Sequence, residues 1–209
     1  MSIPVEIYGL STLIPEVPDG RMVLVEGGTD PAKSFFLRRL TLTAVRSGKK
    51  TTFLTSRDRA ELQALLSAEG KMEPWKEDHL EIDELDGLSA MNGFGRAGGL
   101  LVVDSFSVLT LELAAARFSG LLRELRLLGR TWGTTVLLGT DRGMLDERSE
   151  AIAAHLSDGV IQFHAKEAAE GLQRYLRIPK WTDGRFVDRN VYYSFDGARM
   201  SIDLRNRVL

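Results

Sequence analysis

The fold is decided by one segment of the sequence, MVLVEGGTDPAKS at residues 22–34. The apolar run Met22–Glu26 is typical of a buried strand, and the two glycines that follow it indicate a tight turn. A helix is expected next, over Ser34–Val45. A strand, a glycine turn and a helix in this order indicate an α/β fold, and they are the setting in which phosphate-binding loops occur.

The turn matches the pattern G-x-x-x-x-G-K-[ST] at Gly27, Lys33 and Ser34. In an intact loop of this kind, backbone N–H groups and the helix N-terminus hold the phosphates, the lysine neutralises them, and the hydroxyl binds Mg²⁺. The candidate phosphate-binding residues are therefore Gly27, Gly28, Thr29, Asp30, Pro31, Ala32, Lys33 and Ser34.

Three residues of the turn oppose phosphate binding. Pro31 has no N–H to donate, Asp30 brings a negative charge to an anion site, and Ala32 adds a methyl group where the pattern has its second glycine. We interpret the turn as descended from a phosphate-binding loop. The sequence leaves open whether it still binds phosphate or is a simple strand, turn and helix with a solvated lysine.

Strands and helices alternate after this segment. Apolar runs and helical periodicity predict strands at Thr51–Thr55, His79–Leu85, Leu100–Val103 and Thr135–Gly139, and helices at Asp58–Ala68, at Leu111–Arg130 and in a polar stretch ending at His155. Shorter strands separated by turns follow at Val160–His164, Arg174–Ile178, Val191–Phe195 and Met200–Leu204. This order predicts one α/β domain over residues 1–209, with a mainly parallel central sheet flanked by helices and a C-terminal antiparallel extension.

A candidate metal ligand follows the predicted strand Leu100–Val103. Asp104 ends the run LLVVD, so its carboxylate is expected at the C-terminal edge of the sheet, where α/β proteins bind ligands. Together with Ser34 it is a candidate Mg²⁺ site. The alternative is an aspartate that caps the following turn.

Composition excludes several classes of protein. The sequence has no cysteine, which excludes disulfides and thiolate metal sites, and its 27 basic against 29 acidic residues give no basic field for nucleic acid. No stretch reaches the roughly 18 apolar residues of a membrane span, and the N-terminus lacks the pattern of a secretory signal. We therefore expect a cytoplasmic protein that does not contact a membrane.

In the order of its motifs the chain resembles the KaiC-like branch of the RecA superfamily of P-loop ATPases. The segments that carry the resemblance are the loop GGTDPAKS, LLVVDSFSVL at 100–109, TTVLLGT at 134–140, SDGVIQF at 157–163 and RYLRIPK at 174–180. The resemblance implies a RecA-like P-loop fold, binding of ATP and Mg²⁺, and a homo-oligomeric ring with nucleotide between subunits. It also implies that Lys180 reaches the nucleotide of a neighbouring subunit.

The chain departs from the family where hydrolysis is performed. The family has glutamates at the end of the second strand, whereas this chain has Ser56 and Arg57, and Asp58 is better explained as a helix cap. The family's Lys-x-Arg pair ends in Thr182 here. A missing arginine finger costs about 10³–10⁵ in rate in well-studied cases. No catalytic residue is therefore assigned.

Two further expectations concern DNA and the tryptophans. The loop at residues 141–150 has four acidic and two basic residues, a composition that disfavours DNA binding. Trp132 is predicted to lie in the core, and Trp181 is predicted to contact a base or a neighbouring subunit.

Three functions follow from these features. The first is a regulatory or assembly protein that binds ATP but hydrolyses it weakly or not at all, a degenerate pseudo-ATPase. The second is a nucleotide-free structural subunit that serves as an interaction platform, in a homo-oligomer or in a hetero-assembly with a related subunit. The third is a slow ATPase.

Overall fold

The computed structural model describes residues 2–28, 31–70, 79–84, 98–169, 171–184 and 186–202. Thr29 and Asp30 of the predicted phosphate loop, and most of the glycine-rich segment 86–99, lie outside this range. The helices are α1 (Leu10–Leu13), α2 (Ala32–Arg46), α3 (Arg59–Gly70), α4 (Phe106–Thr110), α5 (Ala115–Trp132) and α6 (Glu147–Leu156). The strands are β1 (Ser2–Pro4), β2 (Glu16–Pro18), β3 (Met22–Gly27), β4 (Thr51–Thr55), β5 (Leu80–Glu84), β6 (Leu100–Val103), β7 (Thr135–Asp141), β8 (Gly159–Ala168), β9 (Gly171–Lys180), β10 (Val187–Phe195) and β11 (Met200–Ile202).

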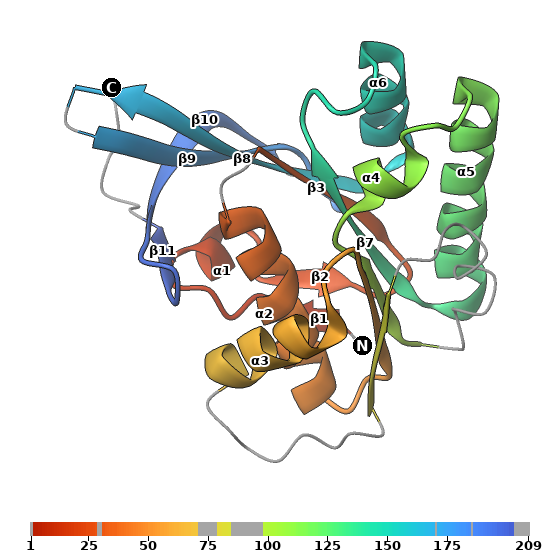
Figure 1. Cartoon of the computed structure of the whole chain (residues 1–209), viewed down its shortest axis with the longest axis horizontal. Coiled ribbons are helices and arrows are strands. Elements are labelled where there is room, and N and C mark those ends of the chain that lie inside the picture. The colour runs from red at the N-terminus through yellow and green to blue at the C-terminus, as the bar shows by residue number, and fades with distance from the viewer. Residues whose placement is uncertain are drawn as a thin grey trace.

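One large sheet forms the centre of the structure (Figure 1), with the strand order β11-β10-β9-β8-β3-β7-β6-β4-β5. The strands from β8 to β5 pair in parallel. The strands from β8 to β11 pair antiparallel. The predicted α/β fold with a parallel centre and an antiparallel C-terminal extension is therefore confirmed. A separate small sheet pairs β1 with β2.

Helices cover both faces of the central sheet. On one face α2 and α3 pack over the strands, and on the other lie α4, α5 and α6 (Figure 1). Side chains of β3 alternate between the two layers: Val23 and Val25 belong to the core beneath α2, and Leu24 belongs to the core beneath α5. Because β3 is buried on both faces, its sequence is a continuous apolar run.

The predicted helix Leu111–Arg130 was wrong at its start. The chain instead forms the short α4, a turn closed by the Leu113 N–H donating to the Thr110 carbonyl, and α5 beginning at Ala115. Leu111 is exposed, and Ala114 has an extended ψ of 143°. Leu111 fitted the apolar period of α5 only in sequence, because the chain turns here to bring Phe106 of α4 against Phe118 of α5, with ring centroids 5.9 Å apart.

Both tryptophan predictions were wrong. Trp132 at the end of α5 is 56% exposed, whereas Trp181, which follows β9, is 3% exposed. The Trp181 ring packs over Gly159 at the start of β8, where a Cβ would lie 3.1 Å from it. Trp181 is thus a core residue of this chain.

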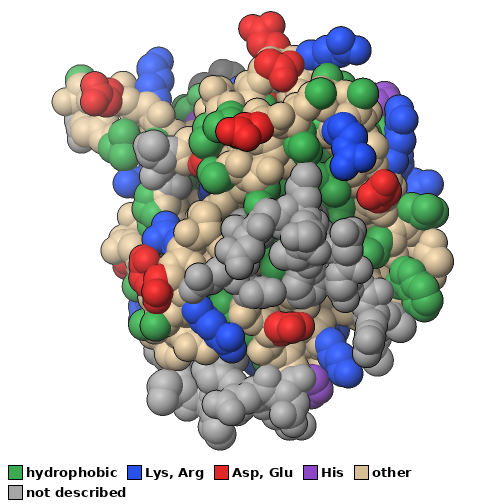
Figure 2. Space-filling model, turned by 45° about the vertical axis from the view of Figure 1, so that its right-hand side comes forward, with side chains coloured by type: hydrophobic (Ala, Val, Ile, Leu, Met, Phe, Trp, Pro, Cys, Tyr) green, Lys and Arg blue, Asp and Glu red, His purple; other side chains and the backbone are tan. Residues whose placement is uncertain are grey.

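The surface carries mixed charge. On the face drawn in Figure 2, basic and acidic side chains are interspersed, and hydrophobic side chains occur singly or in small groups. Among the described residues, no helix is long and apolar enough to cross a membrane.

Candidate functional site

The candidate site lies at the C-terminal edge of the parallel strands. Strand β3 ends at Gly27, and α2 begins at Ala32 with Lys33 and Ser34 in its first turn. Asp104 directly follows β6, and Asp141 ends β7. Because β3, β7 and β6 are parallel neighbours, their ends meet at one edge.

Ser34 and Asp104 are in direct contact. The Ser34 hydroxyl donates to Oδ1 of Asp104 over 3.0 Å, and both residues are buried. Gly139 of β7 allows this placement, since a Cβ there would lie 2.5 Å from the Asp104 carbonyl oxygen. A hydroxyl and a carboxylate side by side are the oxygen donors that Mg²⁺ prefers, so the pair fits this cation.

Lys33 folds back over the glycine turn. Its aliphatic chain crosses Gly27, where a Cβ would lie 3.1 Å from the Lys33 Cβ. Its ammonium donates to Oδ1 of Asp141 over 2.6 Å, and the lysine side chain is only 5% exposed. Gly27 is therefore required by the close approach of the lysine chain, which is the geometry of a phosphate-binding loop.

Asp141 was missed as a site residue in the sequence, where it counted only as part of an acidic loop. Its backbone N–H donates to the Ser107 hydroxyl, 3.1 Å away, and that hydroxyl also lies 3.4 Å from Oδ2 of Asp141. The signal that could have identified it is its position at the end of a buried strand, as for Asp104. The Asp141 carboxylate forms an ion pair with the Lys33 ammonium, which a phosphate group would otherwise contact.

Two of the unfavourable loop residues can be placed. Pro31 is the N-cap of α2, and its carbonyl accepts the first helical hydrogen bond from the Phe35 N–H. Ala32 is fully buried in the first turn of the helix. Gly28 has open space where a Cβ would be, so it imposes no close approach. The helix N-terminus is thus formed, with one donor fewer than in a loop without proline.

The end of β4 offers no water-activating carboxylate among the described residues. Ser56 donates to the Ser105 hydroxyl over 2.8 Å, and Arg57 forms an ion pair with Glu61 on the first turn of α3. Oδ1 of Asp58 accepts the backbone N–H groups of Ala60 and Glu61, at 2.8 and 3.1 Å. The prediction that Asp58 caps this helix is confirmed.

Lys180 lies away from the loop of its own chain. Lys180 of β9 is paired with Val160 of β8, and Val160 is paired on its other side with Leu24 of β3. Leu24 lies three residues before the end of β3. The Lys180 ammonium donates to the carbonyls of His155 and Ser157 at the C-terminus of α6, over 3.0 and 2.5 Å. Burial lowers its pKa. Within the chain, Lys180 caps a helix.

On the other face of β3, Glu26 precedes the loop. Burial raises the pKa of its carboxyl, which accepts from the Gln162 amide over 2.7 Å. Arg142, next to Asp141, donates its backbone N–H to the Gly27 carbonyl, and its guanidinium lies 3.1 Å from Nδ1 of His164. The end of β7 therefore contacts both the loop and the antiparallel extension.

Comparison with known proteins identifies the architecture. No protein-family model matches the sequence, and no curated protein matches it significantly. A KaiC-like protein of the hyperthermophilic archaeon Pyrococcus horikoshii OT3 superposes with a TM-score of 0.73 at 23% identity, covering 97% of this chain and 99% of that one. The flagellar accessory protein FlaH of Methanocaldococcus jannaschii gives a TM-score of 0.76 at 14% identity, covering 97% and 98%.

The fold is RecA-like. The resemblance seen in the sequence is confirmed at the level of the fold, since the chain superposes on both structures over nearly its whole length. In this RecA-like fold Lys33, Ser34 and Asp104 lie together at the helix start.

Proposed function

We propose that the protein binds a nucleoside triphosphate with Mg²⁺ and acts as a regulatory or assembly protein with weak or absent hydrolysis. From the resemblance we expect the nucleotide to be ATP. The observation that carries the proposal is the contact between Ser34 and Asp104, with Lys33 buried beside them at the start of α2. This arrangement combines a helix N-terminus, a cation and metal-binding oxygens at one edge of the sheet.

In this proposal each residue has one task. The N-terminus of α2 attracts the phosphates. Lys33 gives up its ion pair with Asp141 and neutralises the phosphate oxygens instead. Ser34 and Asp104 hold Mg²⁺, which supplies charge neutralisation to the phosphates. Because Asp141 competes for the lysine, we expect weak affinity.

Weak hydrolysis follows from the end of β4 and from the segment after β9. Ser56 and Arg57 cannot take a proton from water as a glutamate does. Lys180 holds helix α6, and Thr182 stands at the position of the family's arginine, so we propose that neighbouring subunits contribute little to phosphoryl transfer.

The alternative is a nucleotide-free platform. Its support is the ion pair between Lys33 and Asp141, which satisfies the lysine without phosphate. In either case we propose one cytoplasmic domain that works in a homo-oligomer, such as a ring, or beside a related subunit, without contact to DNA or membrane.

Calorimetric titration with Mg-ATP tests the proposal. We expect saturable binding to the wild type that is lost in Lys33→Ala and kept in Lys166→Ala, which removes an exposed lysine on β8. If millimolar nucleotide gives no heat of binding, the nucleotide-free interaction platform is the better description of the protein. Phosphate release above the Lys33→Ala background would instead identify a slow ATPase, and light scattering with and without nucleotide reports on assembly.

A further inference from the structure

Three arginines converge on one carboxylate at the N-terminal edge of the central sheet. Asp158 directly precedes β8. Oδ1 of its carboxylate lies within 4 Å of three guanidinium groups, those of Arg126 at 3.1 Å, Arg130 at 3.6 Å and Arg21 at 3.9 Å. Arg21 precedes β3, whereas Arg126 and Arg130 lie in the last two turns of α5. Segments that are distant in the sequence thus bring three cations to one point, the arginine cluster.

The Asp158 carboxylate neutralises only one of these charges. Its Oδ2 accepts the Met22 N–H over 3.1 Å, and its Oδ1 accepts one hydrogen bond from Arg126. Arg21 and Arg130 lie beyond hydrogen-bond distance of it. Among the described residues, no other carboxylate lies within ion-pair distance of the three guanidinium groups. Three positive charges against one negative charge leave the cluster with a net positive charge of two.

Two neighbouring groups reflect this excess of positive charge. Burial lowers the pKa of Lys180, and the charge of Arg126 lowers it further, while the charge of Asp158 opposes the shift. Nε of Arg126 is buried and has no hydrogen-bond partner in the described part of the chain. The side chains of the cluster still reach solvent, since those of Arg126, Arg21 and Arg130 are 32%, 42% and 52% exposed. The cluster therefore presents cationic donors to a ligand from solution.

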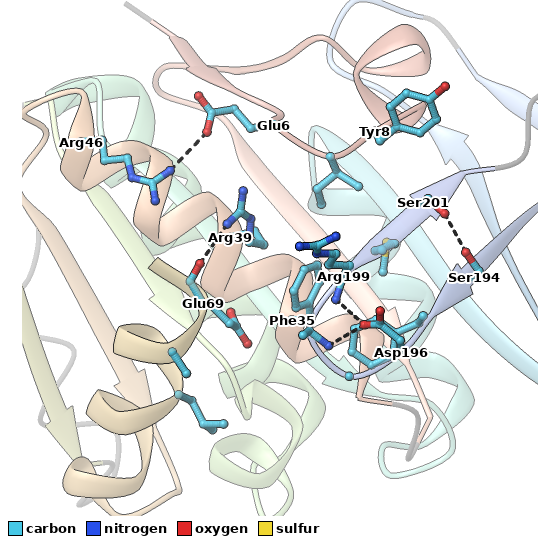
Figure 3. Close-up of a pocket in the computed structure, with 17 residues that line it drawn as sticks. Glu6, Tyr8, Phe35, Arg39, Arg46, Glu69, Ser194, Asp196, Arg199 and Ser201 are labelled. Carbon is cyan, nitrogen blue, oxygen red and sulfur yellow. Dashed lines mark hydrogen bonds and ion pairs between the residues drawn. The ribbon is translucent and has the colours of Figure 1, made fainter. Parts of the chain in front are cut away.

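The cavity beside α2 differs in this respect (Figure 3). This cavity of about 1020 Å³ lies between α2, α3 and the turn joining β10 to β11, and its lining has as many carboxylates as guanidinium groups. Arg46 faces Glu6 over 3.6 Å, and Oδ1 of Asp196 accepts the backbone N–H groups of Ala198 and Arg199. Charges are balanced in the cavity, whereas the arginine cluster has an excess of one sign.

A phosphate group matches the arginine cluster better than a carboxylate does. A guanidinium group is a planar fork of N–H donors that binds phosphate or carboxylate oxygens through two parallel hydrogen bonds. Three such groups around one point suit a tetrahedral anion with several oxygens and a charge of about −2, which also balances the charge of the cluster. A carboxylate has two oxygens and one charge, so it would leave donors and charge unmatched.

We propose that Arg21, Arg126 and Arg130 bind a phosphate group, supplied either by free phosphate or by a small phosphate ester. Arg21 and Arg130 give up no hydrogen bond to Asp158 when they bind it, and Arg126 contacts it while continuing to hold Asp158. The site is separate from the candidate nucleotide site, because the cluster lies where β3 and β8 begin and the nucleotide site lies where β3 ends.

Calorimetric titration of the full chain with inorganic phosphate at constant ionic strength tests this site, because constant ionic strength removes the effect of general screening. We expect saturable binding with a dissociation constant on the order of 1 mM. Arg130→Gln and Arg21→Gln should each weaken it about tenfold or more, the effect of losing one charge-assisted hydrogen bond. Arg123→Gln is the control, since it removes an exposed arginine of α5 outside the cluster. Titration with glycerol phosphate distinguishes a phosphate ester from free phosphate as the source.

The outcomes separate this site from the candidate nucleotide site. Absence of saturable binding by both anions overturns the proposal. Equal binding by the wild type and by the double variant Arg21→Gln, Arg130→Gln, with circular dichroism showing the variant folded, overturns the role of the cluster. Binding that is lost in Lys33→Ala but kept in the double variant assigns the phosphate to the start of α2 and also overturns this site. Binding that is kept in Lys33→Ala and lost in the double variant supports the proposal, whatever the result with Mg-ATP.

Discussion

Replacing Asp141 by asparagine should have opposite effects on the free protein and on nucleotide binding. The Lys33 ammonium and Oδ1 of Asp141 are 2.6 Å apart, and the side chains are 5% and 30% exposed. Two unit charges at this distance attract by about 6 kcal/mol at an effective dielectric constant of about 20. Desolvation of Lys33 and the access of water to Asp141 reduce the net contribution to about 1–3 kcal/mol.

In the free protein, Asp141→Asn should therefore lower the melting temperature by about 2–12 °C, at about 2–4 °C per kcal/mol for a chain of this size. With saturating nucleotide the loss should shrink, because phosphate oxygens then replace the carboxylate as partners of Lys33. A tenfold gain in affinity adds about 1.4 kcal/mol of ligand stabilisation.

The assay is thermal unfolding of wild type and variant with and without Mg-nucleotide. Glu167→Gln serves as the control, since it removes one exposed negative charge at the end of β8. A variant that melts like the wild type when free, or gains no more from nucleotide than the wild type does, would refute the idea that this carboxylate competes for the lysine.

Three further predictions concern stability. Trp181→Ala should destabilise the fold by about 3–5 kcal/mol, and Trp132→Ala by no more than about 0.5, both measured by urea unfolding; similar losses would contradict the burial seen here. Asp158→Ala should cost about 3–5 kcal/mol in the same assay, because its buried carboxylate accepts from the Met22 N–H and the Arg126 guanidinium; a loss below about 1 kcal/mol would show that these groups find other partners. Burial raises the pKa of Glu26 above 4.5, so the folded state holds this proton more tightly than the unfolded state. The free energy of unfolding of the wild type should therefore fall as pH rises from about 4.5 through the raised pKa. Glu26→Gln should remove this dependence, and equal changes of unfolding free energy with pH in wild type and variant would disprove it.

The strands of the parallel core could be predicted from the sequence because they are marked by composition, although their order in the sheet could not. Leu100–Val103 and Thr135–Gly139 are continuous apolar runs, as strands covered on both faces must be. The meeting of Lys33, Ser34 and Asp104 followed from the same reasoning, since parallel strands end at one edge of a sheet.

Other features depend on contacts that sequence patterns do not encode. The burial of Trp181 depends on Gly159, which is 22 residues away in the sequence and leaves room for the indole ring. The pairing of Lys33 with Asp141 joins residues 108 positions apart. The short strands β1 and β2 pair only with each other and have no periodicity long enough to predict them.

The position of β3 in the sheet has a consequence for how the chain is made. This strand carries the loop, yet its hydrogen-bonding neighbours are β7 and β8, which are synthesised more than a hundred residues later. When the loop leaves the ribosome, both strands that flank β3 have yet to be made. The same holds for Asp104 and Asp141, whose carboxylates contact Ser34 and Lys33 in the folded chain. The candidate site is therefore complete only once residue 141 has been made, and a truncated product ending before residue 159 should leave an apolar edge of β3 for chaperones to shield.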